Sequence, residues 1–280
     1  MSEIPFVRYG GPLDIFRVWL TSPLRRYATR QPPNFLKELL VNKVMPAILP
    51  RSSAGVVVTL PGGGRVKMDF SEEIARLLLL HGAYEASEIA AVVALAQPGS
   101  TTIDVGANVG MYTVALATRI GSTGKVLAFE PVPRTSRRLR ANIELNGLEN
   151  VEVFEAAAGE CPGVADLQLA NDSAYASMAG VKQGRAIGQH LSVRVTSLDE
   201  VWNGRQRPGV SFCKIDVEGA ELSVLAGAEE MLATCRPALL LEADPGPELE
   251  ALASWLKPRS YREQRSADFS PWNHLFVSEA

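Results

Sequence analysis

Residues 101–110 read Thr-Thr-Ile-Asp-Val-Gly-Ala-Asn-Val-Gly, and this stretch decides the fold of the 280-residue chain. Its first five residues form a short apolar run, which is typical of a buried strand, and Gly106 begins the turn that follows. A helix is predicted from about Val109 to Ile120, where Gly121 ends it. Glycine lets a backbone turn tightly and approach a ligand closely, so the turn predicts a nucleotide-like ligand at Gly106 and Gly110.

From residue 86 onward the chain alternates between helix and strand patterns. Strands are predicted at residues 101–105, 126–130, 151–157, 191–195, 211–215, 238–242, 261–265 and 274–277. Helices are predicted at residues 86–96, 109–120, 135–146, 218–234 and 249–256, with Thr135 capping the third, and residues 163–188 read as a polar excursion. Strands separated by single helices imply right-handed crossovers and a mainly parallel sheet, with ligands at the carboxyl ends of the strands.

The segment before residue 86 has a different pattern. Residues 1–53 are predicted to form a helical arm, because basic residues alternate there with leucines and isoleucines at helical spacing. We expect this arm to be a packing element or the contact of a homodimer rather than a membrane-surface helix. Residues 54–280 are predicted to be the second unit, with a hairpin over 56–68 and a helix from Ser71 to Leu80 (together 54–85) ahead of a core at 86–280.

The composition excludes several classes of protein. Hydrophobic residues make up 46% of the chain and charged residues 21%, as in globular proteins and unlike disordered chains. A net charge of -3 disfavours a general nucleic-acid binder. Neither a signal peptide nor an apolar run near the ~20 residues that span a bilayer is expected. Cys161, Cys213 and Cys235 lack metal-site spacing and are expected to be buried thiols in a reducing compartment, so we expect a cytoplasmic protein.

Two acidic residues are predicted to lie at the ends of neighbouring strands. Asp104 lies where a carboxylate can accept hydrogen bonds from a ligand amine or hydroxyl, and Glu130 lies where an acid can bind both hydroxyls of a ribose. A dinucleotide-binding fingerprint requires G-x-G-x-x-G, and here Asn108 replaces the middle glycine. This departure weakens a nicotinamide or flavin interpretation.

Taken together, these motifs resemble those of the FkbM family of S-adenosylmethionine-dependent methyltransferases, from about Val56 to the carboxyl end. The resemblance is carried by Gly82-Ala83-Tyr84-Glu85, Asp104 to Gly110 with Tyr112-Thr113, Phe129-Glu130-Pro131, Thr196-Ser197-Leu198-Asp199, Lys214 to Glu221, and Arg236-Pro237 leading to Glu242. It implies a Rossmann-like class I α/β fold, which is a mostly parallel seven-stranded sheet with an antiparallel last strand and helices on both faces. It also implies S-adenosyl-L-methionine as the cofactor.

The resemblance implies a role for individual residues of the cofactor site. The residues that would surround the methionine part are Asp104, Gly106, Asn108 and Gly110. Glu130 would bind the ribose, while Ala157 and Ala158 would flank adenine. The residues that would close over the methionine end are Tyr84 and Glu85, and Tyr112 and Pro131 complete the predicted cofactor site.

Two motifs that the sequence lacks narrow the choice of the atom that accepts the methyl group. Methyltransferases that act on exocyclic base nitrogens or glutamine nitrogens resemble one another in an Asn/Asp-Pro-Pro-aromatic run. This chain has Asp216-Val217-Glu218-Gly219 instead, which disfavours methylation of such a nitrogen. Pyrimidine-carbon methylation uses a Pro-Cys pair, and this chain has Cys161-Pro162 in the opposite order. The FkbM resemblance implies O-methylation, so we expect a small-molecule hydroxyl acceptor such as a sugar or polyketide. A cofactor-binding subunit without turnover and a nicotinamide-dependent oxidoreductase stay open as alternatives.

Two residues are predicted to be catalytic. Asp216 ends a central parallel strand and therefore faces the ligand crevice. His274 begins the last strand, which is antiparallel in this fold class, so it is expected at the same sheet edge as the general base. Trp272 and Asn273 would then be substrate contacts.

Carboxylates offer an alternative way to activate the acceptor. Asp216, Glu242 and Asp199 can meet as oxygen ligands if the strand ends bring them together. Carboxylates alone are a weak metal signal, so no metal is predicted. Glu221 is expected to stabilise the start of the helix predicted at 218–234.

Overall fold

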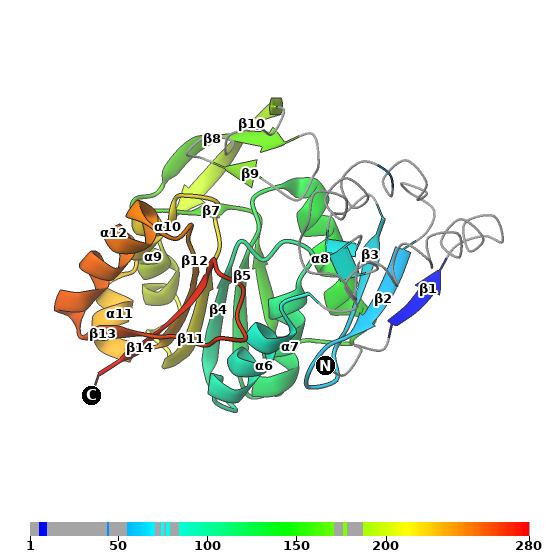
Figure 1. The fold of residues 1–280 in the computed structure, drawn as a ribbon, viewed down its shortest axis with the longest axis horizontal. Coiled ribbons are helices and arrows are strands. Elements are labelled where there is room, and N and C mark those ends of the chain that lie inside the picture. The colour runs from blue at the N-terminus through cyan, green and yellow to red at the C-terminus, as the bar shows by residue number, and fades with distance from the viewer. Residues whose placement is uncertain are drawn as a thin grey trace.

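The computed structural model describes residues 6–9, 44, 55–70, 74–75, 77–78, 84–170, 176–177 and 187–279. Its largest part is a seven-stranded sheet in the order β13-β14-β12-β11-β4-β5-β6 (Figure 1). The strands are β4 (Thr101–Val105), β5 (Lys125–Phe129), β6 (Val151–Phe154), β11 (Val210–Ile215), β12 (Ala238–Glu242), β13 (Tyr261–Gln264) and β14 (Asn273–Ser278). β14 runs antiparallel to β12 and β13, and the other neighbours are parallel. This arrangement confirms the predicted Rossmann-like class I fold.

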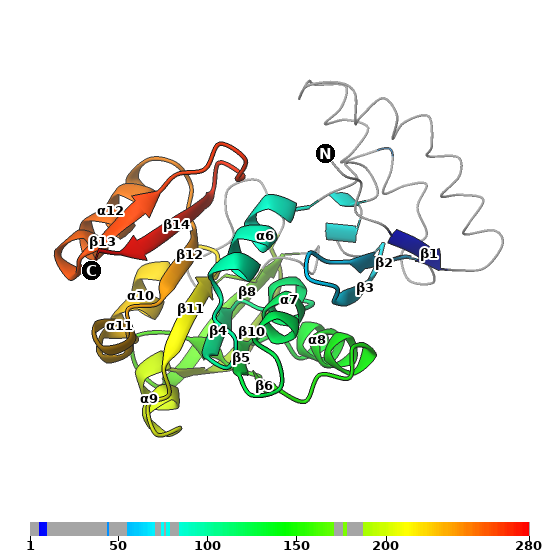
Figure 2. The ribbon, with the colours of Figure 1, turned by 90° about the horizontal axis from the view of Figure 1, so that it is seen from below.

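Helices cover both faces of the sheet (Figure 2). One face carries α6 (Ala86–Leu95), α7 (Met111–Ile120) and α8 (Pro133–Leu145). The other carries α9 (Leu198–Asn203), α10 (Glu221–Ala226), α11 (Glu229–Cys235) and α12 (Pro247–Leu256), followed by a 3-10 turn, η2 (Lys257–Arg259). The buried apolar residues accordingly form two large clusters, one on each face of the sheet.

Strand alternation sends the polar residues of two central strands to the same face. Ile103 and Val105 of β4 pack in the cluster under α9–α12, so Asp104 between them points toward α6 and α7. Ile215 of β11 packs in that same cluster, and its neighbour Lys214 points the other way. The register of β4 and β11 pairs Lys214 directly with Asp104. A buried ammonium therefore lies beside a buried carboxyl group.

The predicted hairpin is present as β2 (Gly55–Thr59) and β3 (Arg65–Asp69). It is anchored on α8 by Asn142, whose Oδ1 accepts from Lys67 N (2.8 Å) and whose Nδ2 donates to Lys67 O (3.1 Å). A third strand, β1 (Phe6–Tyr9), pairs with β2. The helical arm predicted for 1–53 is therefore wrong at residues 6–9, and apart from residue 44 the rest of it lies outside the described residues.

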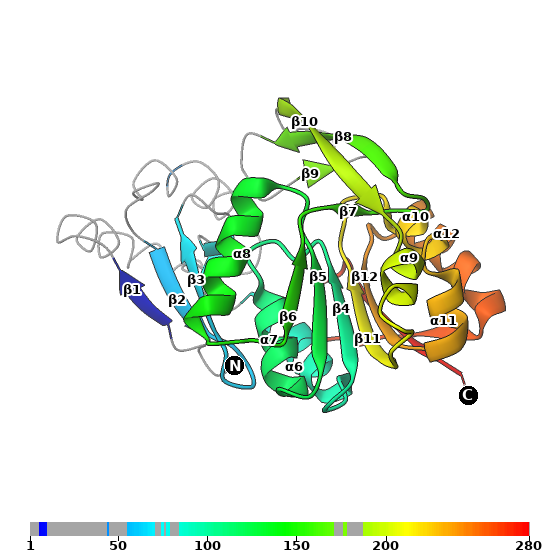
Figure 3. The ribbon, with the colours of Figure 1, turned by 180° about the vertical axis from the view of Figure 1, so that it is seen from behind.

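Residues 157–196 contain a second sheet that the sequence analysis did not predict. Its strands are β7 (Ala157–Ala158), β8 (Gly163–Ala170), β9 (Ala176–Ser177) and β10 (Ile187–Thr196), in the order β7-β10-β8-β9. The prediction of a polar excursion at 163–188 is therefore wrong, and so is the single strand at 151–157, which divides into β6 and β7. Alternating apolar residues of β8, namely Ala165, Leu167 and Leu169, supplied a period-two signal. Figure 3 shows this sheet at the carboxyl ends of β4, β5 and β6.

The long helix predicted at 218–234 is divided into α10 and α11. Gly227 lies between them and packs so closely on the chain that a Cβ there would lie 2.0 Å from the Gly159 carbonyl oxygen. The helical bond from Met231 N to Gly227 O is also replaced, because Gly227 O accepts from Asp199 N (2.8 Å) and Met231 N donates to Asp199 Oδ1 (2.8 Å). The cap predicted for α8 is also displaced, because the helix begins at Pro133 and Thr135 lies in its first turn.

Smaller expectations have mixed outcomes. Residues 74–75 and 77–78 are helical, as predicted for 71–80, whose cap Ser71 lies outside the described residues. Cys213 is buried, Cys235 is half-buried and Cys161 is exposed, so the expectation of three buried thiols is wrong for Cys161. Among the described helices, none combines the length and the apolar character needed to cross a membrane.

Candidate functional site

A cavity of about 480 Å³ opens at the carboxyl ends of β4, β5, β11 and β12. Most of the predicted site residues line it, namely Tyr84, Glu85, Gly106, Asn108, Tyr112, Glu130, Pro131, Ala157, Ala158 and Asp216. Three do not line it: Asp104, Gly110 and His274. The structure thus brings residues from both halves of the sheet together at one cleft, which is the position expected for a ligand in a parallel α/β sheet.

The turn after β4 requires glycine at two positions. Gly106 has φ +76°, and a Cβ there would lie 1.8 Å from the carbonyl oxygen of Asp216. Gly110 has φ +97°, and a Cβ there would lie 2.6 Å from Leu139 Cδ1 on α8. Gly106 therefore lets the cleft floor approach the end of β11, whereas Gly110 serves the packing of α7 on α8.

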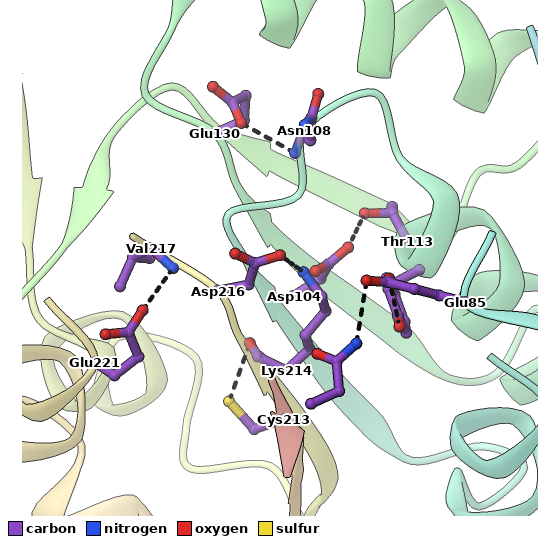
Figure 4. A network of polar contacts seen from close by, with 12 residues as sticks. Glu85, Asp104, Asn108, Thr113, Glu130, Cys213, Lys214, Asp216, Val217 and Glu221 are labelled. Atoms are coloured by element: carbon purple, nitrogen blue, oxygen red, sulfur yellow. Dashed lines mark hydrogen bonds and ion pairs between the residues drawn. The ribbon is translucent and has the colours of Figure 1, made fainter. Parts of the chain in front are cut away.

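Glu130 is held at the end of β5 by the backbone. Its Oε2 accepts from Asn108 N (3.0 Å) and its Oε1 accepts from Val132 N (2.9 Å), as Figure 4 shows for the first of these bonds. Asn108 adopts φ +49°, a left-handed conformation that asparagine tolerates better than most residues. Burial raises the pKa of Glu130 to about 7 against the lowering effect of the two N–H donors. The carboxyl group is fixed in orientation and retains lone pairs that can accept from a ligand diol.

Lys214 is the single buried ammonium among the described residues that line the cleft. Its Nζ lies 2.7 Å from Asp216 Oδ2 (Figure 4). It also lies 4.8 Å from the centroid of the Tyr112 ring. The surrounding carboxylates, Asp216 first and then Asp104 and Glu85, raise the pKa of Lys214 against the effect of burial. Lys214 therefore stays protonated and compensates several acidic groups at once.

Asp104 lies beneath the cleft and not on its wall. The residue is fully buried, and its Oδ2 accepts from Thr113 Oγ1 of α7 (2.5 Å). Its Oδ1 has no hydrogen-bond partner among the described protein atoms. Burial raises the pKa of Asp104, and the Lys214 ammonium opposes the rise. The expectation that Asp104 contacts the methionine part directly is therefore replaced by a supporting position under the floor.

Glu85 joins three elements above the cleft. Its Oε2 accepts from Tyr112 Oη of α7 (2.9 Å), and its Oε1 accepts from Asn273 Nδ2 of β14 (3.1 Å). It precedes α6 with φ +46°. Burial raises the pKa of Glu85, which Lys214 lowers. Asn273, expected as a substrate contact, is thus engaged by Glu85, and Trp272 lines the cleft with 47% of its surface exposed.

Three carboxylates lie close together in the cleft at the carboxyl ends of β11 and β12. Asp216, Glu218 and Glu242 each place an oxygen within 4.8 Å of the others, so they could hold a cation. Asp199 does not join them, because its carboxylate accepts from Glu230 N (2.9 Å) and Met231 N (2.8 Å) at the start of α11. The alternative ligand set drawn from the sequence is therefore wrong at Asp199.

Glu221 has the supporting role predicted for it. It is buried at the start of α10, where its Oε1 accepts from Val217 N (3.1 Å) and Gly219 N (3.2 Å). These bonds fix the loop that carries Asp216 and Glu218 into the cleft.

His274 does not reach the cleft. Asn273 and Leu275 face α6, so alternation turns His274 to the α12 face, where its Nδ1 lies 2.9 Å from Glu263 Oε1 of β13. Its Nε2 is buried without a hydrogen-bond partner among the described atoms. The prediction that His274 is the general base is not compatible with this placement.

Sequence reasoning missed Lys214 as a functional residue. Lys214 and Asp216 are two residues apart on one strand, so a period-two pattern already placed both side chains on the same face. It also missed Val132, Ala156 and Leu167, which form an apolar wall beside Glu130 together with the predicted Ala157 and Ala158. No local motif marks Leu167, because its strand belongs to the second sheet.

The residues of this cleft fit S-adenosylmethionine. Glu130 can accept from two ribose hydroxyls, since both of its oxygens are already oriented by backbone donors. The apolar wall at Ala156–Ala158 and Leu167 lies next to it and can pack on a purine ring. At the other end, Glu85 offers carboxylate oxygens to an ammonium group.

Comparisons with known proteins agree with this description. Residues 104–264 match the family described as "Methyltransferase FkbM domain". The chain is 30% identical over 155 residues to "Methyltransferase 1" of Beauveria bassiana (strain ARSEF 2860), which covers 47% of this chain and 59% of that protein. It is 28% identical over 156 residues to "Methyltransferase sdnD" of Sordaria araneosa, covering 46% of this chain and 60% of that protein.

A solved structure is also similar to this chain. It is the crystal structure of "Methyltransferase FkbM" from Methylobacillus flagellatus KT, with 18% identity and a TM-score of 0.46. The match covers 76% of this chain and 56% of that chain. The chain thus spans less than two thirds of the length of each of these three relatives.

Proposed function

The chain belongs to the FkbM methyltransferase family, and on this basis we propose that it transfers a methyl group from S-adenosylmethionine to a hydroxyl of an uncharged small molecule. The observation that carries the proposal is a single cleft lined by both Glu130 and Asp216, which follow β5 and β11 on either side of β4 and its glycine turn. Glu130 is arranged for a ribose, and Asp216 lies beyond it at the end of the next strand but one. An acceptor beside Asp216 would therefore lie on the methionine side of the cofactor.

When bound, S-adenosylmethionine supplies the methyl group from a positively charged sulfonium. The chain then has to orient the acceptor oxygen in line with the methyl group and take up its proton. Asp216 is suited to accept that proton, because the Lys214 ammonium keeps it ionised in a half-buried position. As the carbon–oxygen bond forms and the carbon–sulfur bond breaks, the hydroxyl proton passes to an Asp216 oxygen and later to solvent.

The charge of the cleft restricts the class of acceptor. Its described lining includes Glu85, Glu130, Asp216, Glu218, Glu242 and Asp244, against Lys214. Lys214 is already paired with Asp216, so no lining cation among the described residues is left over for a phosphate or carboxylate. Trp272 offers an exposed ring on which a sugar or an alicyclic ring can pack. These features favour a sugar or polyketide-type acceptor without anionic groups over nucleic acid or a phosphorylated substrate.

Calorimetry tests the cofactor assignment. S-adenosylhomocysteine should give saturable heat with the purified protein, and NAD should give none. Glu130→Ala should weaken binding of S-adenosylhomocysteine about 10- to 100-fold, by ~1.5 to 3 kcal/mol for lost charge-assisted hydrogen bonds. Binding of NAD alone would support the oxidoreductase alternative instead.

Labelled methyl transfer tests the acceptor class. Wild-type protein and labelled S-adenosylmethionine are incubated with paired acceptors, each a neutral polyol or polyketide and its phosphorylated counterpart. Label should appear as an ether on the neutral member of a pair and not on the phosphorylated one. Cofactor binding without transfer to any member of a broad panel would favour the non-catalytic subunit, and preferred transfer to phosphorylated acceptors would contradict the charge argument.

A further inference from the structure

The segment between β13 and β14, residues 265–272, ends at an exposed aromatic ring in the cleft. Trp272 lines the cleft with 47% of its surface exposed. Its carbonyl oxygen accepts from Ala243 N (2.9 Å) just after β12, which is on the far side of β11 and β4 from Glu130. An aromatic ring this exposed contributes little to the core, and it offers a large apolar face to a ligand.

A buried acid of α6 holds the same segment from the other side. Glu88 is 2% exposed, and its Oε1 accepts from Ser270 N (2.6 Å), a residue 182 positions further along the chain. A buried carboxylate is costly unless hydrogen bonds compensate it. Glu88 meets this requirement through Ser270 and through its place in the first turn of α6, where the helix amino terminus stabilises negative charge.

The two anchors lie on either side of the Trp272 side chain. Ser270 is fixed to α6, the Trp272 carbonyl is fixed to the chain after β12, and Asn273 N donates to Ser270 O (3.2 Å) to close the turn between them. Phe269, the residue before Ser270, packs on the apolar cluster that includes α6. The backbone at Trp272 is therefore held before any ligand arrives, which lowers the entropic cost of a contact with its ring.

We propose that Trp272 determines acceptor specificity by packing on the C–H face of a saturated ring, and that Glu88 is a positioning residue that holds Trp272 in place. This inference rests on the proposed function of the cleft. The acceptor chemistry is a neutral saturated ring bearing the hydroxyl, which a sugar or an alicyclic polyketide supplies. A contact with the non-reacting part of an acceptor is made equally before and during transfer, so its loss should raise KM and leave kcat nearly unchanged.

Methyl-transfer kinetics test the role of the ring. The acceptors are a methyl pyranoside and an alicyclic alcohol, each compared with its open-chain counterpart, and the methylated ring identifies its source. Trp272→Ala should raise the KM of the ring acceptor at least about tenfold, with the open-chain KM and kcat changed less than about threefold. Leu145→Ala, which removes an exposed apolar side chain of α8 outside the cleft, should leave every value unchanged.

The same kinetics separate positioning by Glu88 from a merely structural role. Glu88→Gln keeps an oxygen that can accept from Ser270 N, so the ring KM should stay within about twofold of wild type. Glu88→Ala should raise it about fivefold, with the affinity for S-adenosylhomocysteine unchanged. Glu144→Ala, the same change at an exposed position of α8, should have no effect. Equal effects of Trp272→Ala on ring and open-chain acceptors, or equal losses in Glu88→Gln and Glu88→Ala, would overturn the proposal.

Amide hydrogen exchange in the ligand-free protein does not depend on turnover. The Ser270 amide should exchange slowly in wild type and in Glu88→Gln, and at least about tenfold faster in Glu88→Ala, while the amide of Leu240 in β12 stays protected in all three. Equal exchange at Ser270 in the three proteins would overturn the positioning role of Glu88. If no acceptor is methylated, the proposed function fails and the acceptor role of Trp272 fails with it, whereas the exchange result still decides whether Glu88 holds the segment.

Discussion

The two halves of the cleft are built by different means. On the cofactor side, the turn at 106–110 and Glu130 are fixed by backbone groups, with two N–H donors on one carboxyl group. On the side proposed for the acceptor, hereafter the acceptor side, Asp216 is fixed by the Lys214 ammonium, and Glu218 and Glu242 lie beside it. Backbone geometry is specified by glycine and by strand ends, whereas the balance of charges depends on residues that are distant in sequence. Local sequence patterns therefore predict the first half, whereas the second half depends on the fold to bring its charges together.

The largest effect is expected at the contact between the two halves of the cleft, where Gly106 lies against the Asp216 carbonyl. Gly106→Ala should destabilise the protein by more than about 4 kcal/mol, because a Cβ would collide with the Asp216 carbonyl at a positive φ. Gly147→Ala is the matched control, since its φ is +60° with nothing within 4 Å, and should cost about 1 kcal/mol. Urea unfolding measures both. Equal losses would show that the close approach to Asp216 is not a constraint.

The next largest effect is expected when the positive charge of Lys214 is removed from the acceptor side. Lys214→Met should destabilise the protein by about 3 kcal/mol, because it leaves Asp104 and Asp216 without their buried counterion. Lys125→Met, at an exposed position on β5, should stay within about 0.5 kcal/mol of wild type. Unfolding at several pH values measures both variants, and the deficit of Lys214→Met should shrink in acid as the orphaned acids are protonated. A deficit independent of pH would mean that packing, not charge, is the role of Lys214.

The third effect is a change in cofactor affinity with the protonation of Glu130. Ligand-free Glu130 has a folded pKa of about 7, above its ordinary 4.5, so the stabilising effect of its neutral form is present below pH 4.5 and is lost as pH rises toward 7. Ribose hydroxyls donate to the ionised form, so affinity for S-adenosylhomocysteine should drop up to about tenfold per pH unit below 7. Glu130→Gln should bind more weakly at pH 8 and approach wild type at pH 5. Calorimetric titrations over this range measure the affinities, and parallel curves for the two proteins would contradict the prediction.

The difference between the halves also explains what the sequence could predict. Gly106 and Glu130 were identified correctly in position, because an apolar strand followed by glycine and a strand-end acid are local patterns. The same local reasoning placed Asp104 on the wall of the cleft. In the structure, the alternation of side chains along β4 places Asp104 beneath the floor of the cleft, where it is fully buried. A motif fixes where a residue lies along the chain, but the pleat decides which way it points.

His274 and Asn273 illustrate that limit on the acceptor side. The sequence placed the start of the last strand at the correct sheet edge, and a shift of one residue decides which of the two side chains faces the cleft. The register with β12 turns Asn273 to the side of Glu85, to which it donates, and turns His274 away. Gly227 is a second case, because its contact with the Gly159 carbonyl is long-range and leaves no local signal for the break between α10 and α11.

The smallest expected effect is the energetic coupling between the two halves of the cleft. Glu85 accepts from Tyr112 of the cofactor side and from Asn273 of the acceptor side, so each donor helps to orient the carboxyl group for the other. Tyr112→Phe and Asn273→Ala should each cost about 1 kcal/mol of stability. The double variant should cost less than the sum by about 0.5 kcal/mol, because the second removal acts on a Glu85 that is already released.

Urea unfolding of the four proteins gives this coupling energy, and Thr113→Val supplies the control. Thr113 lies beside Tyr112 on α7 but donates to Asp104, so its cycle with Asn273→Ala should be additive within ~0.3 kcal/mol. Additivity in both cycles would mean that Glu85 does not transmit between the halves, and that the cleft behaves as two independent sites on one sheet. Coupling confined to the Tyr112 cycle would identify Glu85 as the connection between the cofactor side and the acceptor side.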